Sequence, residues 1–330
     1  MDITQLPEVL HGQPQFRFQQ INHLLYQDLI VDWQQATVLP KALMTELALH
    51  CPLTIIAMVT KLPRSSSKAV ITLADGLKIE TVLINNTDGR HTVCVSSQVG
   101  CPLGCKFCAT GAMGFKRNLT SQEIVEQVLY WARQLKDQDE SIDNIVFMGM
   151  GEPLLNIDNV LSAIKIINDP ESLNLGSRRI SVSTVGIKAG LDKIMRSSLQ
   201  INLAISLHAP TDKLRAQLMP VHQNTSLKEL MAMVAHYTEQ TNRQVMFEYI
   251  MLKEVNDNLA EAEKLAVLLD NHRLYMVNLI NYNQTGKFRP STPARIRAFQ
   301  NILLRAGLKV TVRDSQGQAS QAACGQLAVT

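Results

Sequence analysis

The sequence lacks any run of apolar residues long enough to cross a lipid bilayer, which takes about 20 residues in a helix. Its first residues, Met1–Pro7, also lack the basic and then apolar pattern of a secretory signal peptide. We therefore expect a cytoplasmic protein with no membrane partner. Low-complexity tracts are missing too, and the only repetition is an alternation of β-rich and helical segments.

A strong charge of either sign is also absent, since the formal net charge is +3. So mild an excess permits a nucleic-acid partner but does not by itself argue for one. The chain has 330 residues, of which 46% are hydrophobic. This length and composition predict one large domain and a smaller one, with a sizeable core.

Cysteine is scarce, yet three of the six cysteines lie in one run, Cys101-Pro-Leu-Gly-Cys105-Lys-Phe-Cys108. In a reducing compartment such clustering indicates metal binding or catalysis rather than disulfides. Iron–sulfur clusters normally take four thiolates, so these three would bind three irons of a [4Fe–4S] cluster and leave the fourth iron open. Structural zinc is the simpler alternative, but it usually needs a second cysteine or histidine pair, and the sequence has none.

From about residue 93 onward, β-rich apolar runs alternate with segments of helical period. Strands are expected at Val93–Ser97, Ile145–Met150, Ile180–Thr184, Ile201–Leu207, Val245–Met251 and Met276–Ile280. Helices are expected at Ser121–Lys136, Asn159–Ile167, Leu227–Glu239, Ala260–Asp270 and Ala294–Leu304, the first beginning at a capping box of Thr120 and Glu123. Six β/α units predict an α/β fold, a partial and open six-unit barrel, because a closed eight-unit barrel typically needs more chain.

The first 75 residues have a different pattern, with helices expected at Gln19–Ile30 and Leu43–His50. They predict a small N-terminal helical accessory domain over residues 1–75. The runs Ala69–Leu73 and Leu77–Ile84 flank Asp75-Gly76, a favoured hairpin turn, and predict a β-hairpin linker that extends to about residue 92. The barrel, with a cysteine-bearing C-terminal loop, would then occupy residues 93–330.

Polar residues follow four of the expected strands at their carboxyl ends, where barrel enzymes build their sites. Gly149 and Gly151 would let backbone approach a ligand, and Glu152 could pair with a ligand ammonium group. The other strand-end residues are Ser183, Ser206, His208 and Asn283. Each one alone is more simply a hydrogen-bonded turn residue, but their recurrence at one end of four strands favours a binding site.

Three cysteines lie outside the run Cys101–Cys108. An isolated cysteine is usually an inert, buried residue, and Cys51, beside Pro52, fits that description. Cys94 precedes Cys101 by seven residues, so it could face the same cavity. Cys324 is followed by a glycine suited to a tight loop.

Taken together, these segments resemble the radical S-adenosylmethionine (SAM) RNA adenine methyltransferases of the RlmN/Cfr family. The cysteine spacing, with Phe107 before the last cysteine, is similar to that of the radical SAM superfamily. The matching strings are Cys94–Cys101, Gly114-Phe115 with Arg117–Leu119, Met148–Asn156, Ser206–Pro210, Asn278–Ile280 and Ala322–Leu327. They extend over nearly the whole expected barrel, while Phe16–Ile21 is similar more loosely.

This resemblance implies a partial barrel of radical SAM type and an RNA-binding role for the helical domain. Cys101, Cys105 and Cys108 would bind the [4Fe–4S] cluster. Two SAM molecules would be used per turnover, one as methyl donor and one as radical source. The implied SAM-binding residues are Gly151, Glu152, Ser183, Ser206, Leu207, His208 and Asn283.

The resemblance also implies the roles of three catalytic residues. Cys324 would accept a methyl group from SAM, and the radical would then take a hydrogen from that methyl, so that its carbon adds to C2 or C8 of an adenine. Cys94 would attack the Cys324 sulfur to release the product, leaving a disulfide to be reduced, and Glu80 would be the proton acceptor. Radical chemistry is needed because this ring carbon is not nucleophilic.

The implied partners are ribosomal RNA, transfer RNA as a further substrate, and an electron donor such as flavodoxin with its reductase. A base that reacts at a ring edge must be unstacked, which favours a loop or bulge of folded RNA. We expect the protein to act as a monomer. Basic side chains near the mouth of the barrel are expected to bind phosphates, namely Arg64, Lys68, Lys116, Arg117, Arg178 and Arg179.

The chain also departs from the family's sequence pattern. Ala319 and Ser320 stand where the family commonly has Asp-Ile before the Ala-Ala-Cys, and Tyr282-Asn283-Gln284 replaces Trp-Asn-Pro. A divergent paralogue acting on another RNA or another carbon is therefore an alternative. A non-catalytic iron–sulfur RNA-binding or redox-sensing protein is a further one, although a sensor would not need the distant thiol of Cys324.

Overall fold

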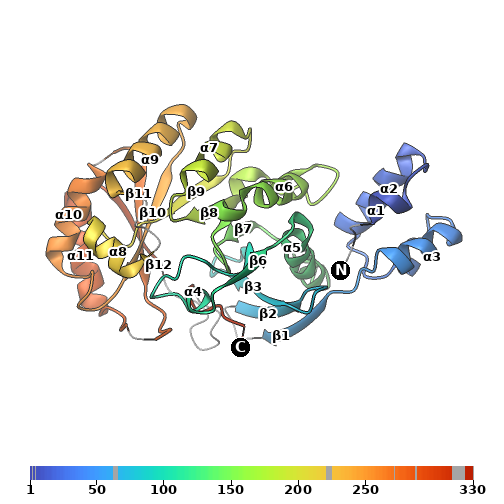
Figure 1. Cartoon of the computed structure of the whole chain (residues 1–330), viewed down its shortest axis with the longest axis horizontal. Helices are drawn as coiled ribbons and strands as arrows, with labels where there is room; N and C mark the ends of the chain where they lie inside the picture. The colour runs from blue at the N-terminus through green and yellow to red at the C-terminus, as the bar shows by residue number, and fades with distance from the viewer. Residues whose placement is uncertain are drawn as a thin grey trace.

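The computed structural model describes residues 1, 3, 5–61, 66–220, 225–270, 272–286, 288–313 and 324–329. Its main sheet has ten strands in the order β1-β2-β3-β4-β7-β8-β9-β10-β11-β12 (Figure 1). The strands are β1 Ile56–Lys61, β2 Ser66–Thr72, β3 Lys78–Asn85, β4 His91–Cys94, β7 Asn144–Phe147, β8 Ile180–Thr184, β9 Asn202–Ser206, β10 Val245–Met251, β11 Tyr275–Asn281 and β12 Lys309–Arg313.

This sheet is mixed and open. Strands β1 to β4 pair antiparallel, whereas β4 and β7 to β12 pair in parallel. In the described part of the chain β1 and β12 are its two edges, so the barrel does not close. The expected α/β fold with a partial barrel is confirmed. β12 adds one parallel strand to the six that the sequence predicts.

Helices cover the outer face of the curved parallel strands (Figure 1). The helices of the barrel region are α4 Ala109–Ala112, α5 Ser121–Lys136, α6 Ile157–Asn168, α7 Lys188–Arg196, α8 Asp212–Leu218, α9 Leu227–Thr241, α10 Leu259–Leu269 and α11 Pro293–Arg305, with 3-10 turns η2 Pro153–Asn156 and η3 Ser177–Arg179. The capping box predicted for α5 is present, since the side chains of Thr120 and Glu123 each bond the backbone of the other residue. Among the described residues, no helix is both long and apolar enough to cross a bilayer.

The N-terminal segment contains α1 Leu6–Val9, α2 Gln15–Tyr26, η1 Trp33–Gln35 and α3 Lys41–His50. Its buried Trp33 donates a hydrogen bond from Nε1 to the carbonyl of Cys51 at 2.7 Å. Arg133 of α5 donates to the carbonyls of Ile30 and Leu53 at 2.7 and 3.1 Å. The helical segment is thereby fixed to the first long helix of the barrel, although its standing as a separate domain stays a prediction.

The hairpin expected around Asp75-Gly76 is formed by β2 and β3, with Gly76 at φ +81° and the Leu77 amide bonded to the Asp75 carboxylate. Because β3 also pairs with β4, this hairpin continues the barrel sheet. A second, two-stranded sheet joins β5 Gln98–Gly100 to β6 Phe115–Asn118 on either side of the cysteine run. It brings both ends of that run together at the rim of the barrel.

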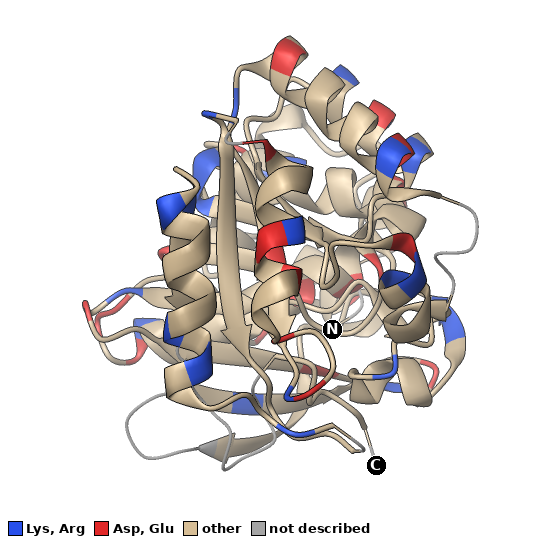
Figure 2. Ribbon diagram, turned by 90° about the vertical axis from the view of Figure 1, so that its left-hand side faces the viewer, with Lys and Arg blue, Asp and Glu red and all other residues tan. Residues whose placement is uncertain are grey.

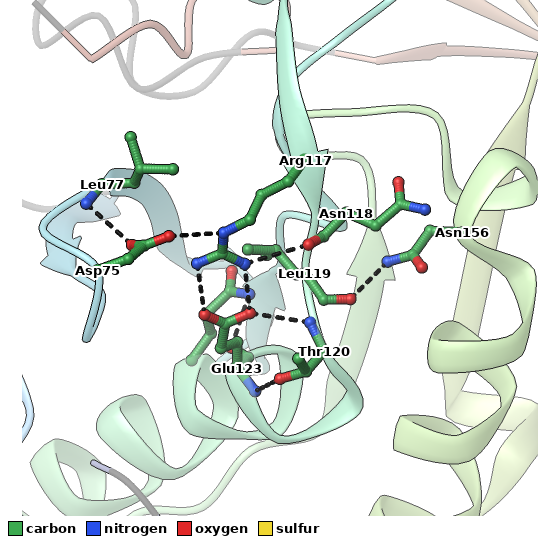
Figure 3. Close-up of polar contacts among 9 residues, drawn as sticks. Asp75, Leu77, Arg117, Asn118, Leu119, Thr120, Glu123 and Asn156 are labelled. Atoms are coloured by element: carbon green, nitrogen blue, oxygen red, sulfur yellow. Dashed lines mark hydrogen bonds and ion pairs between the residues drawn. The ribbon is translucent and has the colours of Figure 1, made fainter.

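Arg117 of β6 fixes this small sheet to its surroundings (Figure 3). Its Nε donates to Asp75 of the hairpin at 2.7 Å, and its two Nη atoms donate to the two carboxylate oxygens of Glu123 at 2.8 Å each. One guanidinium therefore joins the hairpin turn, the cysteine-bearing region and the start of α5.

Candidate active site

A cavity opens at the carboxyl ends of the parallel strands, and nine of the expected site residues line it. These are Cys101, Cys105, Cys108, Gly151, Glu152, Ser183, Ser206, His208 and Cys324. They come from the loop after β5, the loop after β7, the ends of β8 and β9, and the C-terminal segment. The other four, Glu80, Cys94, Leu207 and Asn283, lie outside the lining residues.

Backbone contacts fix the cysteine run. The Cys101 amide donates to the carbonyl of Gly114 at 2.9 Å, and the Cys108 amide donates to the carbonyl of Cys105 at 3.1 Å. Gly100 has φ +75° and an added Cβ would lie 1.9 Å from the Gly114 oxygen, so only glycine fits there. Burial raises the pKa of Cys101 to about 12, and that of Cys105 well above its ordinary value. Metal binding would deprotonate such thiols outright.

The donor set fits an iron–sulfur cluster better than a single zinc ion. All three thiols line one cavity. Structural zinc takes four closed protein ligands, one more than this loop supplies. Three thiolates can hold three irons of a [4Fe–4S] cube and leave the fourth iron for a non-protein ligand.

The glycine turn after β7 packs directly against the strand that leads into the cysteine run. Gly151 has φ +104°, and a Cβ there would lie 2.6 Å from the Gln98 side chain. The side-chain oxygen of Gln98 accepts a hydrogen bond from the backbone amide of Glu152 at 2.8 Å. Its side-chain nitrogen donates one to the Asn118 side chain of β6, also at 2.8 Å. Gln98, which the sequence analysis did not single out, therefore positions the turn relative to the cysteine loop.

The Glu152 carboxylate is held by three donors. Its Oε1 accepts from the Thr184 hydroxyl at 2.6 Å and the Leu154 amide at 3.0 Å, and its Oε2 accepts from the Val185 amide at 3.1 Å. Burial raises the pKa of Glu152, while these hydrogen bonds favour the ionised form. Two carboxylate oxygens offer about four acceptor positions, so one remains for a ligand ammonium group.

His208 is held as a neutral ring in the cavity wall. Its backbone has φ +59°, an uncommon conformation for a residue with a side chain. The Ile250 amide donates to its Nδ1 at 3.2 Å, which places the ring proton on Nε2. Burial lowers the pKa of His208 to about 3, and the ring packs edge-on against Phe107 at 4.8 Å.

The segment that carries Cys324 is anchored to both sides of the cavity. Thr110 donates to the Leu327 carbonyl at 2.6 Å, and the Ala109 amide donates to the Gly325 carbonyl at 2.8 Å. These two bonds fix it to α4, directly after the cysteine run.

Two predicted site residues bond this same segment. Asn283 donates to the Cys324 carbonyl at 3.1 Å, and Glu80 accepts from the Ala328 amide at 2.9 Å. Glu80 also accepts from Lys68 at 2.8 Å. In this structure both residues therefore position the C-terminal segment. Leu207 is fully buried.

All six cysteines are free thiols. Burial, with the charge of Cys324 as a second cause, raises the pKa of Cys94 to about 12, so the two groups interact electrostatically. Loss of hydration raises the pKa of the Cys324 thiol to about 11, although the residue as a whole keeps an exposed surface. Arg313, at the end of β12, lowers the pKa of both thiols.

Two further residues were missed in the sequence. Glu248 lines the cavity and accepts from Ser183 at 2.7 Å. As a lone carboxylate in the apolar strand Val245–Met251, it could have been singled out, because buried parallel strands are mostly apolar. Buried Arg215 donates to the carbonyls of Val185 and Ser206, and its position on the short α8 gave no signal.

The structure corrects the expected phosphate-binding set. Arg178 and Arg179 precede β8 at its amino end. They therefore lie at the ends of the strands opposite those that form the cavity. There Arg178 bonds Gln200 and Arg179 bonds Asp143. Both arginines directly precede the expected strand Ile180–Thr184, so their place at its amino end could have been inferred from the sequence, because barrel sites form at the carboxyl ends of strands.

The remaining basic residues divide by their contacts. Arg117 is engaged with two carboxylates (Figure 3) and Lys68 with Glu80. Arg64 lies outside the described residues. Lys116, next to the exposed Phe115 on β6, keeps an exposed side chain beside the cysteine loop and stays a candidate for phosphate binding.

Three comparisons with known proteins agree with this geometry. The radical SAM superfamily model matches residues 95–266. A crystal structure of a radical SAM methyltransferase from Sphaerobacter thermophilus superposes with a TM-score of 0.94 at 42% identity, covering 99% of this chain and 97% of that one. The maturase HydG of the [FeFe]-hydrogenase, with a TM-score of 0.52 at 12% identity, shares the fold alone.

Curated relatives match over almost the full length. A probable dual-specificity RNA methyltransferase RlmN from Dictyoglomus thermophilum is 41% identical, covering 99% of this chain and 94% of the relative. A protein of the same description from Thermus thermophilus is 44% identical, with 98% and 92% covered. The three-cysteine loop, the glycine turn and these matches place the chain in the radical SAM superfamily and, within it, in the RlmN family.

Proposed function

We propose that this protein is a radical SAM RNA methyltransferase that methylates C2 or C8 of an adenosine in ribosomal RNA, with transfer RNA as a further substrate. The observation that carries the proposal is the meeting of Cys324 with the three-cysteine loop in one cavity, in a chain of the RlmN family. A low-potential donor such as flavodoxin with its reductase would supply electrons, and the protein would act as a monomer.

Cys101, Cys105 and Cys108 would hold the [4Fe–4S] cluster, which when bound supplies the electron that generates a radical from SAM. Glu152 would accept hydrogen bonds from the SAM ammonium group, for which it keeps free acceptor capacity. Gly151 would let the ligand approach the backbone of the turn. Ser183, Ser206 and His208 would bind the remainder of SAM.

The two separate thiols would perform the group transfer. The Cys324 thiolate attacks the methyl carbon of SAM, forming a carbon–sulfur bond while the sulfonium takes back its electron pair. After this methyl carbon has joined the base, the Cys94 thiolate attacks the Cys324 sulfur. A disulfide forms, the carbon–sulfur bond breaks, and the carbon keeps the electron pair and is protonated to a methyl group. Before that attack the radical adduct must lose one proton, which Glu80 would accept, and one electron, which a one-electron acceptor such as the oxidised cluster would take up. After it, a dithiol reductant restores both thiols.

RNA nucleosides from cells with and without the gene test the function directly. Mass spectrometry should show one methyladenosine that disappears on deletion and returns with the wild-type gene. Complementation with Cys324→Ala should not restore it, whereas Cys51→Ala should. Unchanged methyladenosine in the deletion strain would overturn the proposed activity.

The cluster is tested on the anaerobically purified protein. About four irons per chain and a brown chromophore are expected. Replacing Cys101, Cys105 or Cys108 with Ala should abolish both, while Cys51→Ala, in the N-terminal segment, should change neither. Stoichiometric zinc without iron would contradict a cluster at this site.

A further inference from the structure

A row of polar side chains crosses the parallel strands at the floor of the cavity. Glu248 on β10 is in register with Ser206 on β9 and with Asn278 on β11, and Asn278 is in register with Thr311 on β12. Residues in register on neighbouring parallel strands project from the same face of the sheet. The row therefore shares the face on which Glu248 and Ser206 line the cavity.

Glu248 is only half satisfied by the protein. The residue is 4% exposed, and its Oε2 accepts from Ser183, whose hydroxyl also lies 3.2 Å from that of Ser206. Its Oε1 is buried and has no hydrogen-bond partner among the residues that the structure describes. A buried carboxylate oxygen without a donor is costly, so a donor from outside the chain is expected.

The neighbouring side chains do not supply this donor. The Asn278 side chain accepts from the Thr311 hydroxyl at 2.9 Å, and no bond joins it to Glu248. Ser206 is engaged with Ser183. Arg313 acts on Glu248 only as a charge that favours its ionised form. The Glu248 carboxylate thus lies beside the hydroxyls of Ser183 and Ser206 in the cavity lining, and its Oε1 can still accept a hydrogen bond.

We propose that Glu248 is a binding residue whose Oε1 accepts a hydrogen bond from a ribose hydroxyl of the adenosyl group bound in this cavity. A vicinal diol fits because one hydroxyl can donate to the carboxylate while the other exchanges a hydrogen bond with Ser183 or Ser206. The ammonium end of the same ligand is accounted for by Glu152, on the turn beside the cysteine loop. This inference rests on the proposed function in taking SAM as the ligand.

The test pairs protein variants with ligand analogues. Calorimetry on the anaerobic, cluster-loaded protein compares S-adenosylhomocysteine with its 2′-deoxy and 3′-deoxy analogues. One deoxy analogue should bind wild-type protein about 10- to 100-fold more weakly, as expected for a hydrogen bond to a charged group. Glu248→Ala should bind S-adenosylhomocysteine more weakly by a similar factor and no longer distinguish the analogues. The isosteric Glu248→Gln should keep part of the discrimination.

Glu261→Ala is the matched control. Glu261 is also buried and also has an unpartnered carboxylate oxygen, but it lies on α10 outside the cavity lining. Its replacement should leave the discrimination intact. Equal losses for all three ligands in Glu248→Ala, or no loss, would overturn the ribose contact while leaving the proposed function standing. Wild-type protein that binds none of the ligands would overturn both.

Discussion

Cys94 and Cys324 differ in their surroundings although they are expected to act in one reaction. Cys94 is buried at the end of β4, whereas Cys324 lines the cavity and keeps an exposed surface. The proposed methyl carrier, which would meet SAM and RNA, is thus the accessible one of the two. The proposed resolving thiol is buried, which fits a group that should not itself be methylated.

These roles predict that replacing each cysteine with Ala stops the reaction at a different step. Cys324→Ala should keep its cluster and transfer no methyl group to RNA, because the methyl carrier is gone. Cys94→Ala should stop after the base has been joined to Cys324, because no thiolate remains to break the carbon–sulfur bond. Denaturing gel electrophoresis with labelled RNA should reveal a covalent protein–RNA adduct in Cys94→Ala.

The double variant Cys94→Ala, Cys324→Ala is the control and should form no adduct. Normal turnover by Cys94→Ala without any adduct would show that the two-cysteine mechanism does not apply to this protein.

At the residue scale, the sequence predicts what is local in the chain. The cluster cysteines are separated by three and two residues, so their spacing alone indicates an iron–sulfur site. The surroundings of Glu248 could not be foreseen, because its Oε2 bonds Ser183, which is 65 residues away in the sequence, and the burial of its Oε1 arises only when the strands assemble. Gln98 is similar, since it bonds the backbone of Glu152 only after the sheet has formed.

At the scale of elements, periodicity predicts long and buried segments well. The bounds expected for α5, β8 and β10 are those observed. Strand β7 ends at Phe147, before the expected Met150, because the chain leaves the sheet there to form the glycine turn. The half-exposed β12, the short β5 and β6, and β1 were missed, since pairing with a distant partner rather than local pattern makes them strands.

Arg117 connects three elements, and its removal should loosen them (Figure 3). Its side chain is 31% exposed, so solvent screens its ion pairs in part. The bidentate pair with Glu123 nevertheless favours the upper end of the usual range, and Arg117→Met should lower the free energy of unfolding by about 1 kcal/mol. Denaturant unfolding of the anaerobic protein measures this change, which should shrink in 1 M salt.

Arg90→Met provides the comparison, because Arg90 pairs only locally with Asp88 on an exposed turn. That variant should unfold like the wild type. An Arg117→Met protein as stable as Arg90→Met would show that the three elements hold together without this guanidinium.

For the whole molecule, charge is spread rather than concentrated. In the view of Figure 2, basic and acidic residues are interspersed along the helices. This agrees with the small net charge of +3. RNA affinity is then expected to depend on a few Lys and Arg side chains near the cavity. Lys116 lies beside the cysteine loop, whereas Arg178 and Arg179 lie at the amino end of β8, away from the cavity.

Lys116 and Arg178 test this separation because both side chains are exposed, but Lys116 lies beside the cysteine loop and Arg178 at the amino end of β8. Each phosphate contact that is lost lowers the slope of log affinity against log salt by about 0.7 to 0.9. Lys116→Gln should therefore weaken RNA binding at low salt and flatten this slope by about that amount. Arg178→Gln should leave both unchanged, since its guanidinium contacts Gln200 at the amino end of β8. Filter-binding titrations from low to moderate salt distinguish the two variants. If Arg178→Gln flattened the slope and Lys116→Gln did not, RNA would approach from the edge opposite the cavity, and its base could not reach Cys324.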